Sequence, residues 1–309
     1  MAVKVATRIS YGEFLVEEGA RNPNLVVLDA DLAKSTKTAD FAKAYPDRFF
    51  DMGIAEQNLM GVAAGIALSG KTVCASTFAM FASGRAFEII RNSIGYTHAN
   101  VKVCATHAGI TVGEDGASHQ TFEDLALMRT IPGMTVLNPS DDASAKILLK
   151  QAVDMDGPAY IRLGRASVPV FYDSSADIKI GKANVLREGK DVTVIATGIM
   201  VASAMEAAAY LSEHGVDVRV IDMHTIKPLD EEIIIKAAKE TGKIVTAEEH
   251  SIIGGLGAAV AEVVTRNCPC KIAMVGQHDT FGESGTPDEL REKYGMTAED
   301  IIMAVKGLY

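Results

Sequence analysis

Two neighbouring segments hold most of the side chains that could move protons. Both follow the strand-like stretch Val101–Ala105, and they read Thr106-His107-Ala108-Gly109 and Gly113-Glu114-Asp115-Gly116-Ala117-Ser118-His119-Gln120. Imidazole is the side chain best suited to proton transfer near neutral pH. Glycine, aspartate and serine are also common in solvated turns, which is the alternative interpretation. Two histidines beside two acids at the end of a strand favour a functional loop.

A third candidate is Glu56, which opens the stretch Glu56–Leu68. The residues from Leu59 onward read LMGVAAGIAL, and a helix that is apolar nearly all round is a buried one. A carboxylate at the start of a buried helix needs a partner or a chemical role. It can also be an ordinary first-turn acid that interacts with the helix dipole, and the residues alone leave both interpretations open.

Phe78 and Phe81 follow the strand candidate Thr72–Ala75. Residues three apart share a helix face, so packing of both rings in the core is the simplest interpretation. The end of a parallel strand is also where ligands bind, and a flat cofactor ring could pack against these two side chains.

Four isolated polar residues and one glycine-rich turn complete the candidates. The isolated residues are Arg8, Ser35, Arg162 and Arg165, and arginine suits phosphate although a single one is more often a surface charge. The turn Gly254–Ala259 follows the strand candidate Ile244–Ala247 and could approach a phosphate. Its spacing is not that of a dinucleotide site, and Glu248 and Glu249 would repel a phosphate, so close packing of helix on sheet is favoured.

The elements that position these residues alternate between strand-like and helical patterns, which is typical of parallel α/β architecture. In the first part we expect strands Leu25–Leu28, Thr72–Ala75, Val101–Ala105, Thr135–Leu137 and Ala159–Leu163, with helices near Glu56–Leu68, Ala82–Ile94, Thr121–Arg129 and Ala143–Val153. In the second part we expect strands Val192–Ala196, Val216–Ile221, Ile244–Ala247 and Ile272–Val275, with helices near Val201–His214, Asp230–Thr241 and Leu256–Thr265. We therefore predict two α/β domains, 1–170 and 191–309, joined by a linker over 171–190.

Composition narrows the class of protein. A length of 309 residues suggests about two domains. The net charge of -10 makes a nucleic-acid partner unexpected. The longest apolar runs have ten residues, whereas a membrane-spanning helix needs ~20, so we expect no membrane protein. Four cysteines and an N-terminus without an apolar core lead us to expect a cytoplasmic location.

Eight motifs occur in the order found in transketolases. They are ATR, DADLAKS, GIAEQN, STFAMF, THAG, GEDGASHQ, RTIPGMTVLNPSD and DGPAYIRLGR. The chain thus resembles the pyrimidine-binding and C-terminal domains of that family over essentially its whole length. The resemblance implies a parallel sheet flanked by helices, followed by a smaller α/β domain.

The resemblance also implies a role for each candidate residue. In the family, thiamine diphosphate loses the C2 proton of its thiazolium ring to its own 4′-imino group, and a glutamate bonded to N1′ favours that tautomer. Glu56 stands at this position. Phe78 and Phe81 resemble the aromatic wall for the pyrimidine, while Gly84 and Arg85 stand where a third aromatic is found. The other implied roles are cofactor contact for Asp31 and Ile54, catalysis and substrate binding for His107 and His119, a sugar hydroxyl for Asp115, and the sugar phosphate for Arg8, Ser35 and Arg165. Arg162 has no match and keeps its structural interpretation.

One family feature has no good match. The diphosphate and its Mg²⁺ are held by G-D-G and a later Asn in the N-terminal domain of the family, whereas Gly113-Glu114-Asp115-Gly116 with Asn138 mimics this only weakly. Its place in the motif order assigns it to the substrate loop, so we expect no metal ligands in this chain. A separate N-terminal subunit should supply diphosphate and Mg²⁺ binding, in an assembly of the α2β2 type.

The implied activity is transfer of a two-carbon ketol unit from a ketose phosphate to an aldose phosphate. Two enzymes with the same cofactor are the nearest alternatives: deoxyxylulose-phosphate synthase and the β subunit of 2-oxo-acid dehydrogenases. We would not expect the latter to pair GEDGxSHQ with the THAG histidine, and the former typically has another residue at His107. A non-catalytic regulatory or scaffolding homologue is the alternative of another class, and the joint presence of Glu56, His107, Asp115 and His119 argues against it.

Overall fold

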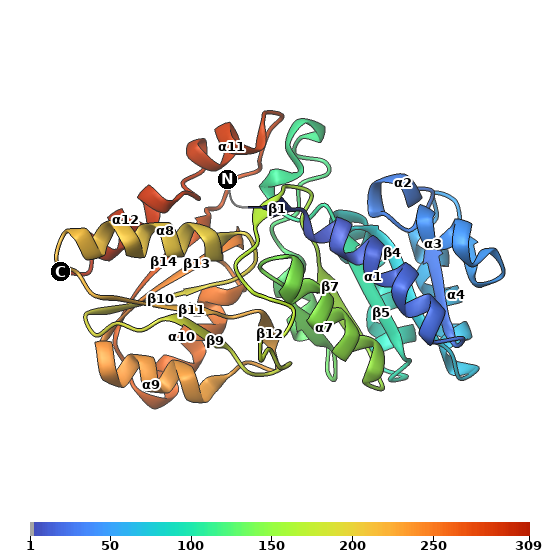
Figure 1. The fold of residues 1–309 in the computed structure, drawn as a ribbon, viewed down its shortest axis with the longest axis horizontal. Coiled ribbons are helices and arrows are strands. Elements are labelled where there is room, and N and C mark those ends of the chain that lie inside the picture. The colour runs from blue at the N-terminus through green and yellow to red at the C-terminus, as the bar shows by residue number, and fades with distance from the viewer. Residues whose placement is uncertain (1–2) are drawn as a thin grey trace.

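The first sheet has seven strands in the order β12-β6-β7-β5-β4-β2-β3, in a computed structural model that describes residues 3–309 (Figure 1). The strands are β2 (Leu25–Asp29), β3 (Phe49–Asp51), β4 (Thr72–Phe78), β5 (Val101–Thr106), β6 (Thr135–Leu137), β7 (Ala159–Arg162) and β12 (Thr225–Lys227). All neighbours are parallel except β12, which is antiparallel to β6. The five strands expected in this half all begin at the expected residue.

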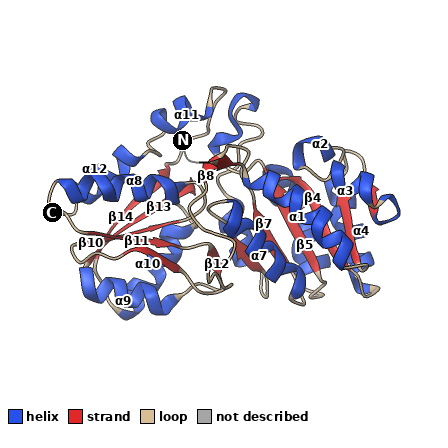
Figure 2. Cartoon of the chain, viewed as in Figure 1, coloured by secondary structure: helices blue, strands red, loops and turns tan. Residues whose placement is uncertain are grey.

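Helices cover both faces of this sheet (Figure 2). They are α1 (Thr7–Arg21) and α7 (Asp142–Asp154) on one face, with α4 (Glu56–Leu68) and α6 (Asp124–Thr130) on the other. Side chains alternate between the faces of a strand, and β4 shows this directly. Val73 and Ala75 pack in the cluster that contains α4, whereas Cys74 packs in the cluster that contains α1 and α7.

Shorter elements connect these helices and strands. They are β1 (Lys4–Val5), α2 (Ala33–Thr36), α3 (Ala39–Ala44), α5 (Phe87–Ile89), β8 (Val168–Pro169), the 3₁₀ turns Pro46–Arg48 and Ile110–Asp115, and the π-helical turns Phe81–Arg85 and Ile90–Gly95. The single helix expected over Ala82–Ile94 is therefore wrong in detail, because the segment is two wide π turns around one short α-helix. Wide turns of this kind are frequent at functional sites.

The second sheet has five strands in the order β14-β13-β10-β11-β9. The strands are β9 (Asn184–Arg187), β10 (Val192–Ala196), β11 (Val218–Asp222), β13 (Lys243–Ser251) and β14 (Lys271–Gln277), and only β9 runs antiparallel to its neighbour. Its helices are α8 (Met200–Glu213), α9 (Glu231–Thr241), α10 (Leu256–Asn267), α11 (Pro287–Lys293) and α12 (Ala298–Lys306). The second α/β unit expected from the sequence is thus present. No helix in 3–309 has the length and apolar character needed to span a membrane.

Two strands join parts of the chain that the sequence patterns left separate. β12 leaves the second half of the chain and extends the first sheet beside β6. β9 lies inside the segment 171–190, which we expected to be a linker, and it forms the edge of the second sheet beside β11. The two halves therefore share a strand as well as an interface.

Candidate functional site

The site lies where β4 and β5 end, which is where parallel sheets bind ligands. Phe78 is the last residue of β4 and pairs in register with Thr106, the last residue of β5. His107 follows directly and turns the chain with a φ of 57°. Its ring stacks on Phe78 with centroids 3.9 Å apart. A left-handed backbone at a histidine is uncommon and often marks a functional position.

Four rings meet at this point. Phe78 and Phe81 stack with centroids 5.9 Å apart and an interplanar angle of 12°. His119 meets Phe81 edge-on at 5.3 Å and Phe78 at 6.3 Å. The structure therefore brings together four residues that the sequence analysis placed in one site, from three separate segments of the chain.

Glu56 is the first residue of α4 and is only 2 % exposed. Its Oε2 accepts a hydrogen bond from Nη1 of Arg85 at 2.8 Å, and the two groups form an ion pair. Arg85 also lies over the ring of Phe81, with Cζ 4.9 Å from the ring centroid. Glu56 and the aromatic pair are thus linked through one guanidinium.

The sequence analysis assigned three residues to a phosphate, and two of them, Arg8 near the start of α1 and Ser35, are in contact. Nη1 of Arg8 donates to the carbonyl of Ser35 at 2.9 Å and lies 3.2 Å from Nε2 of His107. Arg165 donates to the carbonyl of Val112 and to the carboxylate of Glu114, the latter at 2.6 Å. Burial and the nearby charge of Arg165 both lower the pKa of Arg8. Arginine side chains of this kind suit an anionic group.

His107 is neutral in this environment. Burial lowers its pKa to about 3, and the cations of Arg8 and Arg165 act in the same direction. Its Nε2 can then accept the Arg8 hydrogen bond, while Nδ1 lies 2.9 Å from the hydroxyl of Thr106 and can donate to it.

We expect His107 to show no protonation step between pH ~5 and ~8 in an NMR titration of the imidazole nitrogens. Replacing Arg8 by methionine removes one of the cations that disfavour the charged ring, so the pKa of His107 should rise in R8M. A midpoint near ~6.5 in the unmodified chain, the ordinary value for histidine, would contradict this account.

Three further predicted residues lie at the surface. Asp31 is exposed with a φ of 60°, and its N–H donates to Oδ1 of Asp51 at 3.0 Å. Ile54 is 78 % exposed. Asp115 is an exposed residue at the end of the 3₁₀ turn Ile110–Asp115. Their roles toward a cofactor or sugar stay predictions.

Asp29 is a residue of this region that the sequence analysis did not select. It is fully buried and accepts hydrogen bonds from Leu32 N–H and from the hydroxyls of Thr36 and Thr38, at 2.6, 2.6 and 2.9 Å. Burial raises its pKa to about 6. These contacts hold both ends of the short helix α2, which carries Ser35. Its position at the end of β2, inside the motif DADLAKS, is the sequence feature that could have indicated Asp29.

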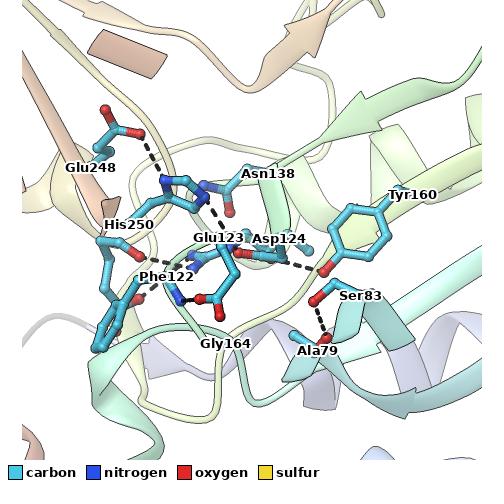
Figure 3. A network of polar contacts seen from close by, with 12 residues as sticks. Ala79, Ser83, Phe122, Glu123, Asp124, Asn138, Tyr160, Gly164, Glu248 and His250 are labelled. Atoms are coloured by element: carbon cyan, nitrogen blue, oxygen red, sulfur yellow. Dashed lines mark hydrogen bonds and ion pairs between the residues drawn. The ribbon is translucent and has the colours of Figure 1, made fainter. Parts of the chain in front are cut away.

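Arg162, the last residue of β7, links the two halves of the chain through its contacts to Asp124 and Glu249. Its Nε donates to Oδ2 of Asp124 at 2.8 Å, and its Nη2 donates to the carbonyl of Glu249 at 2.8 Å. Figure 3 shows Asp124 beside Tyr160, whose hydroxyl donates to the same carboxylate, with His250 nearby. Arg162 thus has a structural role, but the surface charge expected for a single arginine is wrong, because its side chain is only 3% exposed and pairs with a buried carboxylate.

The glycine-rich turn serves packing, as expected. The carboxylate of Glu248 accepts the N–H groups of Leu256 and Gly257 at 2.6 and 2.7 Å, and so occupies the start of α10 (Figure 3 shows Glu248 beside His250). A Cβ at Gly255 would lie 2.1 Å from Oε2 of Glu248, so only glycine allows this approach. A phosphate would have to displace a carboxylate that belongs to the chain. Within 3–309, no group of three or more His, Cys, Asp and Glu is arranged to hold a metal.

Comparison with known proteins agrees with this geometry. Residues 3–170 match the family model for the transketolase pyrimidine-binding domain, and residues 181–301 match the model for the transketolase C-terminal domain. A transketolase C-terminal section from Methanocaldococcus jannaschii is 52% identical, over 96% of this chain and 94% of that protein. A subunit of a 6-deoxy-6-sulfo-D-fructose transketolase from a Clostridium species is 43% identical, over 96% and 92%.

Full-length relatives and solved structures give the same answer. Human transketolase is 37% identical over 99% of this chain but 49% of its own length, so the chain spans about half of it. A solved structure described as a split-gene transketolase in an inactive beta4 tetramer is 57% identical, with a TM-score of 0.92 and 98% of each chain covered. The chain belongs to the transketolase family and consists of its pyrimidine-binding and C-terminal domains.

Proposed function

We propose that this chain is the C-terminal subunit of a thiamine-diphosphate-dependent transketolase, which moves a two-carbon ketol unit from a ketose phosphate to an aldose phosphate. A separate N-terminal subunit completes the site by holding the diphosphate and Mg²⁺, in an α2β2 assembly. The observation that supports this most is the buried carboxylate of Glu56 beside the stacked rings of Phe78 and Phe81. Relatives of the same length are themselves named as sections or subunits of transketolases.

The residues present fit the pyrimidine half of the cofactor. A carboxylate that is 2 % exposed has one ion-pair partner among residues 3–309, and that partner comes from a half-exposed side chain. Such a carboxylate can replace the hydrogen bond from Arg85 with one from a ring N–H, so it is not left without a donor. Phe78 and Phe81 offer an apolar surface for a flat ring. When bound, thiamine diphosphate would supply the carbanion chemistry of the two-carbon transfer.

The other residues of the site would bind and orient the sugar. His107 stacks on Phe78 and His119 meets Phe81 edge-on, and an imidazole can exchange hydrogen bonds with hydroxyl groups. Arg8, Ser35 and Arg165 would hold the phosphate, with Arg165 giving up its contact to Glu114. Asp115 would accept a sugar hydroxyl, and Asp31 and Ile54 would contact the cofactor from the exposed rim.

Arg8, Ser35 and Arg165 would bind the anionic end of the sugar. Relatives are named for a sulfonated fructose and for apulose 4-phosphate, which both carry an anion. The choice of sugar therefore has to be measured with a panel of ketose and aldose phosphates.

Replacing Arg8 by methionine should raise KM for a phosphorylated acceptor by about 10- to 100-fold, because a charge-assisted hydrogen bond to the phosphate is lost. The unphosphorylated aldose should show the same kcat/KM with both enzymes. Steady-state kinetics with the two acceptors measure this. R21M, at the exposed far end of the same helix, is the matched control. An equal loss for both acceptors would show that Arg8 does not bind the phosphate.

The proposed function is tested by reconstitution. The chain is mixed with a candidate N-terminal subunit, thiamine diphosphate and Mg²⁺, and consumption of a ketose phosphate is followed with an aldose phosphate as acceptor. Turnover should require both chains. Tight, Mg²⁺-dependent binding of the cofactor by this chain alone would contradict the division of the site between two subunits. A reconstituted complex that binds the cofactor but transfers no ketol unit from any donor would contradict the reaction.

A further inference from the structure

Arg85 contacts both Glu56 and Phe81. Its guanidinium lies over the ring of Phe81, with Cζ 4.9 Å from the centroid, while Nη1 donates to the buried Oε2 of Glu56 at 2.8 Å. These are the two groups that would contact the pyrimidine under the proposed function, on which this inference rests. A guanidinium is flat, has an N–C–N edge and stacks on aromatic rings, as an aminopyrimidine does.

We infer that Arg85 is a placeholder: its guanidinium pairs with Glu56 when no cofactor is bound, and the pyrimidine displaces it on binding. The ion pair is favourable because a carboxylate as buried as Glu56 is costly without a partner. Pairing with Arg85 lets α4 begin at Glu56 with that carboxylate satisfied.

The surroundings of Arg85 allow it to leave. Its side chain is 50% exposed, against 2% for Glu56, so the guanidinium can turn into water while the carboxylate stays. Its backbone is held in place, because its carbonyl accepts a hydrogen bond from Nε2 of Gln57 at 3.3 Å. It also ends the π-helical turn Phe81–Arg85, directly after the exposed Gly84. The guanidinium can therefore exchange its contact with Glu56 for water while the backbone stays in place.

The binding test uses the complex with an N-terminal subunit, in which the affinity for thiamine diphosphate with Mg²⁺ is measured by calorimetry. In R85M the competing guanidinium is absent, and the Kd should fall about tenfold, the value of one charge-assisted hydrogen bond. R85K keeps the charge without the flat face and should lie between R85M and the unmodified protein. R91M is the matched control, because Arg91 lies exposed on the next π-helical turn and hydrogen-bonds its neighbour Asn92. An unchanged or larger Kd in R85M would overturn the inference.

A second measurement needs no cofactor. In the isolated chain, NMR of the arginine side chains should show slowed rotation of the Arg85 guanidinium, and E56Q should release it to the behaviour of Arg91. Equal mobility of Arg85 and Arg91 in the unmodified chain would overturn the placeholder. Failure of every variant to bind thiamine diphosphate would instead contradict the proposed function, while the NMR comparison still decides whether Arg85 holds the site.

Discussion

Replacing Glu56 by glutamine should lower kcat of the reconstituted complex by about 10²- to 10⁴-fold, the range for losing a group that controls proton transfer. Glu56 is the buried carboxylate at the start of α4, beside the ring pair on which a pyrimidine would pack. Glutamine has nearly the same volume, so packing around α4 should be preserved. The amide cannot carry the charge that a carboxylate offers to a ring nitrogen, and this is the property that the variant removes.

The Glu56 experiment needs a control of the same kind. E88Q changes an exposed glutamate of the neighbouring α5, whose carboxylate contacts Asn92, and it should leave kcat within about twofold, as surface substitutions usually do. Urea unfolding of both variants shows whether the fold is retained. A folded E56Q complex that turns over at the unmodified rate would refute the role of Glu56 and with it the proposed chemistry.

Local sequence patterns predicted much of the fold. The helix Glu56–Leu68 and the strand Val192–Ala196 have the expected bounds, because largely apolar stretches are bounded by polar or glycine residues there. The helix α7 was expected near Ala143–Val153, and just before it Asp141 accepts the N–H of Ser144 at 2.8 Å in a capping box. Signals of this kind act within a few residues and can be read without knowledge of the rest of the chain.

Other elements depend on distant partners and could not be read in this way. β12 and β9 are short strands whose existence depends on β6 and β11, far away in the sequence. α1 contains Gly12 and Gly19, which weaken a helical pattern. The structure shows the reason for both glycines: a Cβ at either position would lie within 2.6 Å of Lys37 or Tyr45 side-chain atoms.

The candidate site shows the same division. Residue types and motif order placed Phe78, Phe81, His107 and His119 in one site, and in the structure their four rings lie together. The pairing of Glu56 with Arg85 spans 29 residues of sequence, and no local pattern indicates it. The sequence analysis noted only that Gly84 and Arg85 stand where the family has a third aromatic residue. In the structure, the guanidinium of Arg85 lies over the ring of Phe81. Such contacts decide which groups a ligand must displace.

The second large effect concerns stability and lies in the interface between the halves. Replacing Arg162 by methionine should reduce the free energy of unfolding by about 3–5 kcal/mol, as expected when one partner of a buried ion pair is removed. The side chains of Arg162 and Asp124 are 3% and 0% exposed. Without the guanidinium, Asp124 loses its cation and the carbonyl of Glu249 loses a donor.

Urea unfolding at fixed pH measures the difference in the free energy of unfolding between R162M and the unmodified chain. R266M, which removes a surface ion pair with Glu231, should cost no more than about 1 kcal/mol.

The pH dependence separates a lost charge pair from lost packing. Burial alone would raise the pKa of Asp124, but Arg162 holds it below the ordinary value, so in the unmodified chain this group stabilises the fold above the unfolded pKa and less as the pH falls. In R162M burial acts unopposed by that cation, and the folded state should prefer the protonated acid. The stability deficit of R162M should therefore shrink as the pH is lowered from ~7.5 to ~5, since the unfolded chain gains less by ionising Asp124 as the pH approaches the ordinary aspartate pKa of ~3.9. The double variant D124N/R162M should recover part of the loss at neutral pH, because no buried carboxylate is then left without a partner. A deficit that is the same at both pH values and unchanged in the double variant would mean that Arg162 acts through packing alone.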